Sequence, residues 1–188
     1  MTDSTSGRQE PKRARLRTRR PAWRLFDEKL KGHRAQYLRQ TLMATVTMML
    51  VLLLLDLVKQ TVLIASLGAS TFIVFSMPHA KRSKPRYLIG GYAVGTLAGC
   101  TLAVISARLI EFSFADPRVI QICCAAFALG LAFLLMVVTD TEHPPAAALA
   151  LGYVLNEWDL FSLFVVLAGI ALITSVKELI KPKLLDLI

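Results

Sequence analysis

The sequence predicts an all-α membrane protein with four full transmembrane helices plus two short or re-entrant helical segments. Hydrophobic residues make up 55% of the 188 residues, and the mean hydropathy is +0.55, which is high for a soluble domain. Two apolar runs, 88–110 and 119–138, reach the roughly 17–25 residues that a helix needs to cross a bilayer. No polar segment after residue 40 is long enough to fold as a second domain.

The N-terminal part of the chain is basic, and most of the formal net charge of +9 comes from residues before position 40. We expect residues 1–22 to be a disordered cytoplasmic tail that binds anionic lipid. In residues 23–39, apolar side chains recur at near-helical spacing between cations, which predicts an amphipathic helix on the membrane surface. Nucleic acid is not an expected partner, because no nucleic-acid-reading motif accompanies the charge.

The transmembrane domain is predicted over residues 40–177. Six apolar segments fall within it: 40–58, 61–77, 88–110, 119–138, 144–155 and 160–176. The second and fifth are short or carry small residues in their middle, so each either spans or re-enters the membrane. Lysine and arginine concentrate in the 79–86 loop and in "KELIKPK" near the C-terminus. By the positive-inside rule, both termini, including the C-terminal tail 178–188, are cytoplasmic in a multi-pass protein of the cell inner (plasma) membrane.

The six segments divide into two halves of three, each with a short segment in its middle. Three crossings in each half force the halves to run in opposite senses, so the order of segments fits a 3+3 inverted repeat, which is typical of transporters. The halves share almost no residue identity, so the repeat depends on segment lengths alone.

Three glycines of the third segment, Gly91, Gly95 and Gly99, follow one another at intervals of four residues. This spacing predicts a helix face on which another backbone packs closely. It leaves open whether that backbone belongs to the same chain or to a second subunit, and we expect a homo-oligomer.

The stretch "TDTEHPPAAALALG", residues 139–152, interrupts the apolar sequence. Because a residue before proline favours an extended backbone, His143 should end the preceding helix, and Pro144 and Pro145 should form the first turn of the next one. Ala146 and its small neighbours leave that helix start accessible. We expect free backbone N–H groups and a partial positive charge there, which together would bind an anion.

The other short segment offers a second part of this predicted substrate site in Gly68, Ala69, Ser70 and Thr71. Glycine permits a break in the helix, and the hydroxyl groups can cap a helix or donate hydrogen bonds. A small anion between this segment and the His143 turn is one interpretation. The alternative is ordinary helix packing by small residues.

Two acidic residues, Asp140 and Glu142, lie beside the predicted anion site. A carboxylate repels a bound anion unless it is protonated, turned away or paired with a cation. Asp140, Glu142 and His143 are therefore candidates for carrying a coupling proton. For Asp140 the alternative is a solvated turn at the cytoplasmic surface.

The sequence predicts no catalytic site, no cofactor and no metal site. It contains no His-Glu-x-x-His, no Cys-x-x-Cys, no phosphate-binding glycine loop and no Gly-x-Ser-x-Gly. Cys100, Cys123 and Cys124 lie in apolar runs, where a thiol behaves as a small hydrophobic group. We therefore do not expect an enzyme.

Two motifs resemble the HPP family of integral membrane proteins. "EHPPAAALALG" contains the His-Pro-Pro triplet for which the family is named, and the resemblance covers residues 38–176 in the family's order. The second motif matches at Gly68, Ala69, Ser70, Phe75, Pro78, Ser83, Pro85, Arg86, Gly90 and Gly91. Tyr92 stands where many members have histidine, and Ala147 where many have glycine, so no role is carried over for that histidine.

The resemblance implies about four membrane helices and, through similarity to plastid and cyanobacterial members, nitrite transport. We therefore expect a multi-pass transporter or channel for a small inorganic anion, with nitrite as the first candidate. The alternative is a non-transporting structural or sensory membrane protein whose basic tail binds lipid or a partner.

Overall fold

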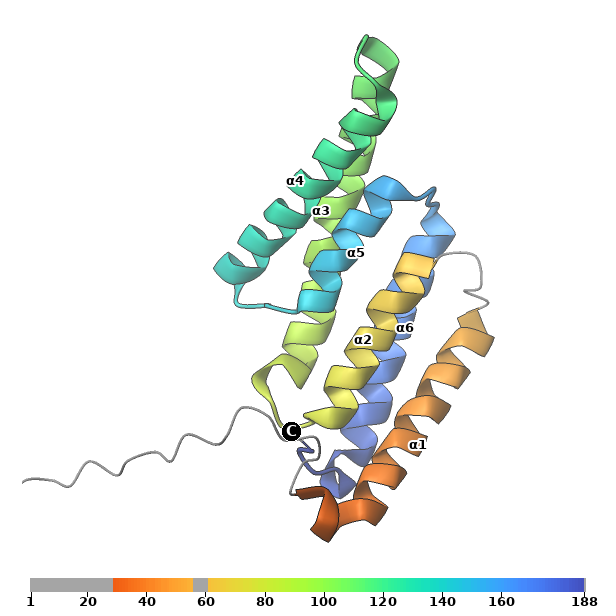
Figure 1. The fold of residues 1–188 in the computed structure, drawn as a ribbon, viewed down its shortest axis with the longest axis vertical. Coiled ribbons are helices and arrows are strands. Elements are labelled where there is room, and N and C mark those ends of the chain that lie inside the picture. Colours follow the sequence, from red (N-terminus) through yellow and green to blue (C-terminus); the bar gives the residue numbers. More distant parts are fainter. Residues whose placement is uncertain (1–28, 56–60, 188) are drawn as a thin grey trace, which may run out of the picture.

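The computed structural model describes residues 29–55 and 61–187, and within them the chain is all-helical. The predicted tail 1–22 and the first residues of the predicted surface helix lie outside the described residues. Figure 1 shows consecutive helices running antiparallel to one another. The α-helices are α1 (Lys29–Leu55), α2 (Thr61–Ser76), α3 (Pro85–Phe112), α4 (Pro117–Thr139), α5 (Pro144–Leu155) and α6 (Leu160–Ile180), with short 3-10 helices η1 (Lys81–Ser83) and η2 (Lys181–Lys183).

Proline and aspartate set the starts of the later helices. Pro85, Pro117 and Pro144 each occupy the first position of a helix, where a missing N–H breaks no hydrogen bond. The Asp116 side chain caps α4 by accepting from a backbone N–H, and the Asp159 side chain caps α6 in the same way.

Three helices are long and apolar enough to cross a membrane: α3, α4 and the segment Leu160–Lys183. The short helices predicted around 61–77 and 144–155 are present, as Val62–Ser76 within α2 and as α5. The fourth predicted full span, at 40–58, corresponds to α1, which does not meet these limits over the residues that are described. Length and composition therefore support three of the four predicted full spans.

The first helix differs from the predicted arrangement at its start. Over the described residues, the segment expected on the membrane surface and the first membrane segment form one helix, α1. Its backbone departs from helical geometry at His33 (φ −129°, ψ 25°), directly after Gly32. The bend therefore lies several residues before position 40, where the sequence placed the boundary.

The helices pack in two groups, α3–α4–α5 and α1–α2–α6, which meet through α2 with α5 and α3 with α6 (Figure 1). Large apolar side chains remain exposed on the outer faces of the helices, among them Leu97, Leu109, Phe127, Phe133, Phe161 and Phe164. An apolar outer surface of this extent is what a lipid bilayer covers.

The face formed by Gly91, Gly95 and Gly99 packs against α5 of the same chain. A Cβ atom at Gly95 would collide with the Ala146 carbonyl oxygen, and one at Gly99 would lie 2.8 Å from the Ala150 Cα. The missing side chains therefore let α3 and α5 approach backbone to backbone. The helix that packs on this glycine face belongs to the same chain.

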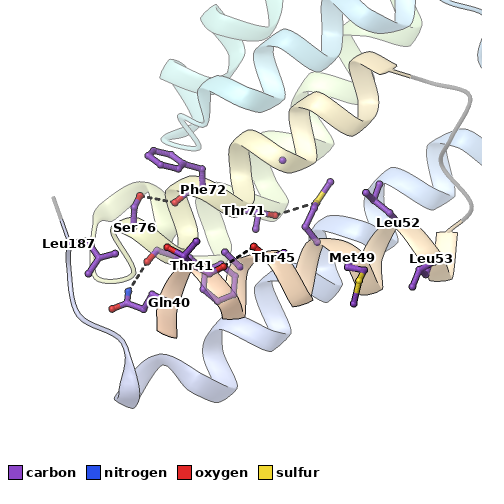
Figure 2. Close-up of a pocket in the computed structure, with 14 residues that line it drawn as sticks. Gln40, Thr41, Thr45, Met49, Leu52, Leu53, Thr71, Phe72, Ser76 and Leu187 are labelled. Carbon is purple, nitrogen blue, oxygen red and sulfur yellow. Dashed lines mark hydrogen bonds between the residues drawn. The ribbon is translucent and has the colours of Figure 1, made fainter. Parts of the chain in front are cut away.

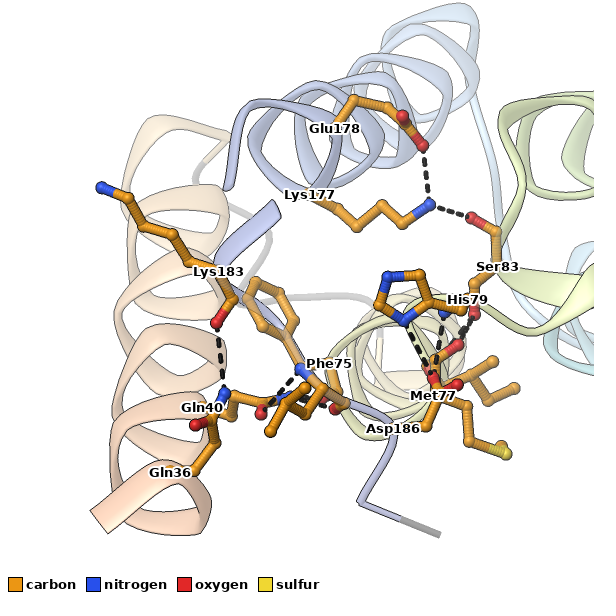
Figure 3. A network of polar contacts seen from close by, with 12 residues as sticks. Gln36, Gln40, Phe75, Met77, His79, Ser83, Lys177, Glu178, Lys183 and Asp186 are labelled. Atoms are coloured by element: carbon orange, nitrogen blue, oxygen red, sulfur yellow. Dashed lines mark hydrogen bonds and ion pairs between the residues drawn. The ribbon is translucent and has the colours of Figure 1, made fainter. Parts of the chain in front are cut away.

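The segment after α6 folds back onto the ends of α1 and α2 (Figure 3). The Gln40 amide donates to the Phe75 carbonyl at 2.7 Å and to the Leu185 carbonyl at 2.9 Å. On the neighbouring side Lys177, which is fully buried, donates to the Ser83 carbonyl at 2.9 Å. Residues 184–187 thus complete the packing at this end of the bundle.

Candidate functional site

The predicted site lies at a break between α4 and α5. At the end of α4, Asp140 adopts a left-handed backbone (φ 52°, ψ 50°), and the Thr141 N–H donates to the carbonyl five residues earlier at 2.9 Å, as in a Schellman C-cap. His143 is extended (φ −139°, ψ 97°) ahead of Pro144, as predicted. The helix ends at Thr139 rather than at His143, because the left-handed residue stops it first.

The amide groups at the start of α5 do not form the predicted anion site. Pro144 and Pro145 have no N–H, and the Ala146 and Ala147 N–H groups donate to the His143 carbonyl at 2.9 and 3.4 Å. Of the four N–H groups that a helix start leaves without an intrahelical acceptor, two are missing and a third is bonded. The prediction of several free N–H groups is wrong, because the prolines that fix this turn also remove its donors.

His143 is 1% exposed, and its ring joins a chain of buried hydroxyl groups. Its Nε2 lies 2.8 Å from the Ser70 Oγ, which lies 2.9 Å from the Tyr92 Oη. The Tyr92 Oη in turn lies 2.8 Å from the Ser66 Oγ. Ser66 donates to the Pro145 carbonyl at 2.7 Å, so the chain returns to the first turn of α5.

The four predicted residues of α2 separate in the structure. Ser70 contacts the His143 ring, whereas Gly68 and Thr71 line a groove on the α1 side of the helix, and Ala69 is exposed. Consecutive helical residues are turned by about 100° from one another. Four in a row therefore cannot share one face, and only Ser70 belongs to the site at His143.

The groove between α1 and α2 has a volume of about 830 Å³ (Figure 2). It is lined mainly by apolar side chains such as Met49, Leu52 and Phe72, with Thr71 donating to the Met48 sulfur at its floor. None of the described residues that line it carries a charge. It offers an ion no counter-charge.

A second pocket, of about 720 Å³, lies between α4 and α5 and reaches His143. Arg82 and Glu142 are its charged lining residues among those described, and most of the rest are apolar. The Nδ1 atom of His143 is buried without a hydrogen-bond partner. Burial lowers the pKa of His143 to about 4; the Arg82 backbone opposes this shift and the Arg82 charge adds to it. His143 and Arg82 thus line one pocket.

Asp140 lies at the outer side of the turn and is held by cations. Lys81 donates to Oδ1 at 2.7 Å, Tyr87 donates to Oδ2 at 2.7 Å, and the Arg86 guanidinium lies 4.0 Å away. The hydrogen bonds from Lys81 and Tyr87 hold the pKa of the Asp140 carboxyl below its usual range and raise the pKa of Lys81. Asp140 is therefore a compensated anion at neutral pH, poorly suited to carrying a coupling proton.

Two residues at the site were not predicted: Arg82 and Tyr92. Ser66, a hydroxyl group of the same short segment, precedes Ser70 by one helical turn, so the two hydroxyl groups share a face. Arg82 belongs to the basic 79–86 loop, which in the sequence indicates membrane orientation alone. Tyr92 became a site residue through the packing of α3 on α5, which no local pattern specifies.

Comparison with known proteins matches residues 29–182 to the family described as "HPP, transmembrane region". A Dictyostelium discoideum protein described as a transmembrane protein is 32% identical over 93 residues. That match covers 50% of this chain and 30% of the Dictyostelium protein, so this chain corresponds to a minor part of its length. No solved structure matches. Since the family match extends over more than half of the residues, the chain belongs to the HPP family of integral membrane proteins.

Proposed function

We propose that this membrane protein is a transporter or channel for a small inorganic anion, which binds in the pocket beside His143. The observation that carries the proposal is a pocket lined by Arg82 and by His143. The Nδ1 of His143 is buried without a hydrogen-bond partner, and an unsatisfied buried polar atom costs about 1–3 kcal/mol. The resemblance to plastid and cyanobacterial HPP proteins makes nitrite the first anion to test.

The charges around the pocket support an anionic ligand. Arg82 makes no ion pair with any described residue, and a guanidinium is a permanently charged, planar donor suited to oxyanions. The charge of Asp140 is compensated by Lys81, so it does not oppose the ligand strongly. Glu142 also lines this pocket, so the anion would bind close to an acidic side chain.

The packing of the helices supports the inverted repeat. Exchanging α1, α2 and α3 for α4, α5 and α6 carries each packed pair of helices onto another packed pair. The contacts α1–α2, α1–α6 and α2–α6 become α4–α5, α4–α3 and α5–α3, while α2–α5 and α3–α6 each map onto themselves. The two halves run in opposite senses (Figure 1), as an inverted repeat requires.

The position of the site also fits a transporter. In transporters with inverted repeats, the substrate lies where the short or broken helices of the two halves meet. Here the short helices α2 and α5 meet, and Ser70 of one contacts His143 at the start of the other. His143 packs against Gly91, six residues into α3 and thus about 9 Å along that helix, so the turn that carries His143 lies deeper than the start of α3.

Purified protein in proteoliposomes tests the proposal. We expect uptake of at least one of nitrite, nitrate, formate and chloride, measured against empty liposomes. Arg82→Gln should lower the rate at least about tenfold, because removing one charged hydrogen-bonding partner costs at least about 1.4 kcal/mol. Lys84→Gln is the matched control: it lies two residues away, is exposed and does not line the pocket.

Two results would contradict the proposal. If none of the four anions enters the vesicles while the protein remains folded, the protein does not act as this kind of transporter, and a structural or sensory role becomes the better explanation. If the Lys84 and Arg82 variants lose activity equally, the effect reflects the net charge of the loop rather than binding in the pocket.

A further inference from the structure

The groove between α1 and α2 stays open at a place where small residues face each other. Gly68 of α2 and Ala44 of α1 both line it. Small residues usually let membrane helices approach backbone to backbone, as Gly95 and Gly99 do on α3. A Cβ atom added at Gly68 would instead meet nothing within 4 Å among the described residues. Gly68 therefore adds space to the groove and makes no close contact between the helices.

The walls of this groove suit an apolar occupant. Its volume of about 830 Å³ falls within the roughly 300–1,000 Å³ of ligand pockets. Most of the lining side chains are apolar, and Met49, Leu53 and Phe72 are exposed among them. If the groove were empty, these side chains would lose dispersion contacts, and they offer water no hydrogen bonds. Because the groove opens on the apolar outer surface of the bundle, the acyl chains of a bilayer are the matching occupant.

The lining of the groove changes from polar to apolar along α1 (Figure 2). Gln40 and Thr41 stand at one end, beside Leu187, whereas Leu52 and Leu53 stand at the other. From Gln40 to Leu53 the helix rises about 20 Å. One leaflet of the hydrocarbon core of a bilayer is about 15 Å thick. The groove is therefore long enough to hold an acyl chain that runs from the membrane surface to the middle of the bilayer.

Two cations stand at the polar end of the groove. Arg39 immediately precedes Gln40, and its guanidinium donates to the Lys183 carbonyl at 2.7 Å. Arg39 and Lys183 are both exposed, and neither forms an ion pair with a residue that the structure describes. The acid of the same C-terminal segment, Asp186, accepts from the His79 backbone N–H at 3.0 Å. Positive charge at the end of an apolar groove attracts the phosphate of an anionic lipid.

We propose that the groove between α1 and α2 holds one acyl chain of an anionic phospholipid from the surrounding bilayer, with the phosphate beside Arg39 and Lys183. The bound chain fills the space at Gly68 and so completes the packing of α1 against α2. This site is separate from the pocket at His143 and does not depend on the proposed transport function. It also differs from the predicted contact of the tail 1–22 with anionic lipid, which lies outside the described residues.

The place of the acyl chain is tested by native mass spectrometry of the full chain in detergent, titrated with dioleoyl phosphatidylglycerol. Gly68→Leu puts a side chain into the groove and should weaken the tightest-bound lipid at least about tenfold, the cost of losing contact with about two methylene groups. Its melting temperature should match or exceed that of the wild type, because the added side chain meets open space. Ala69→Leu is the matched control: the next residue is exposed and does not line the groove, so lipid binding should not change.

The headgroup is tested by the same titration with dioleoyl phosphatidylcholine, which has the same acyl chains and no net charge. We expect phosphatidylglycerol to bind at least about fivefold more tightly, the factor that one lysine or arginine near an anionic lipid supplies. Lys183→Gln should weaken the binding of phosphatidylglycerol about fivefold and leave that of phosphatidylcholine unchanged. Arg118→Gln is the control, because it removes an exposed cation at the start of α4, at the opposite end of the bundle (Figure 1).

Three results would overturn the inference. If Gly68→Leu weakens lipid binding no more than Ala69→Leu does, the tight lipid does not lie in the groove. If the two lipids bind equally well, or if Lys183→Gln and Arg118→Gln act alike, the cations at the polar end do not select an anionic headgroup. If the wild type is a dimer that Gly68→Leu separates into monomers, a second copy of the chain occupies the groove in place of lipid.

Discussion

The Oγ of Ser70 and the Nε2 of His143 lie 2.8 Å apart inside the protein, although 73 residues separate them in the sequence. Ser70 belongs to α2 and His143 stands at the start of α5, so this contact joins the two short helices of the fold. It holds the imidazole in one orientation while its other nitrogen remains without a partner.

Gly95→Ala should destabilise the protein by about 1–3 kcal/mol or more, which is the usual cost of overpacking. A methyl group there would collide with the Ala146 carbonyl oxygen, and a backbone atom cannot rotate away as a side chain can. Thermal unfolding in detergent measures the loss. The control is Gly130→Ala in α4, where an added Cβ meets nothing within 4 Å. Equal melting temperatures for the two variants would contradict the backbone contact between α3 and α5.

Asp140→Asn should lower the melting temperature at neutral pH, because it removes the carboxylate bonded to Lys81 and Tyr87. Asparagine tolerates the left-handed backbone, so the change isolates the charge. The folded-state pKa of Asp140 is lowered from 3.8. The stability that Asp140 contributes is therefore complete at pH values above its pKa in the unfolded chain, and it is lost as the pH falls through the pKa in the folded protein.

The difference in melting temperature between wild type and Asp140→Asn should therefore stay constant from neutral pH down to about pH 5 and shrink only in stronger acid. A difference that already disappears between pH 7 and 6 would show that another group, and not Asp140, is titrating.

Lys177→Met should cost about 1–3 kcal/mol, the penalty for leaving a buried carbonyl without its donor. Lys177 is fully buried, and its ammonium group bonds the Ser83 carbonyl at 2.9 Å and Glu178 at 2.6 Å (Figure 3). Methionine keeps most of the volume, so the change removes mainly the donor. The matched control is Lys181→Met, whose ammonium lies 3.7 Å from the same Glu178 on the surface, and it should change stability by less than about 0.5 kcal/mol.

Gln40→Leu should release the C-terminal segment, because Gln40 is fully buried and its amide bonds the Phe75 and Leu185 carbonyls. We expect faster proteolysis after residue 180 and a loss of stability of about 1–3 kcal/mol. Gln36→Leu is the control, since Gln36 makes a longer, exposed bond of 3.3 Å to the Lys183 carbonyl. If both variants are cleaved at the wild-type rate, Gln40 does not fasten this segment.

The sequence by itself determined the helical membrane fold, the two short helices and the break at His143. These features follow from local causes: the length of an apolar run, the restriction that Pro144 places on the residue before it, and the spacing of Gly91, Gly95 and Gly99. Each acts within a few turns of one helix, so a pattern in the chain is enough to show it.

The tertiary structure alone decided which groups meet at the break. The prolines that mark α5 in the sequence also remove its amide donors, so side chains from elsewhere must provide the chemistry. Tyr92 and Ser70 reach His143 because α3 and α2 pack on α5, and Ala69 does not because it lies on another face of its helix. Such contacts depend on the rotation and depth of each helix against its neighbours, which residue spacing along the chain does not fix.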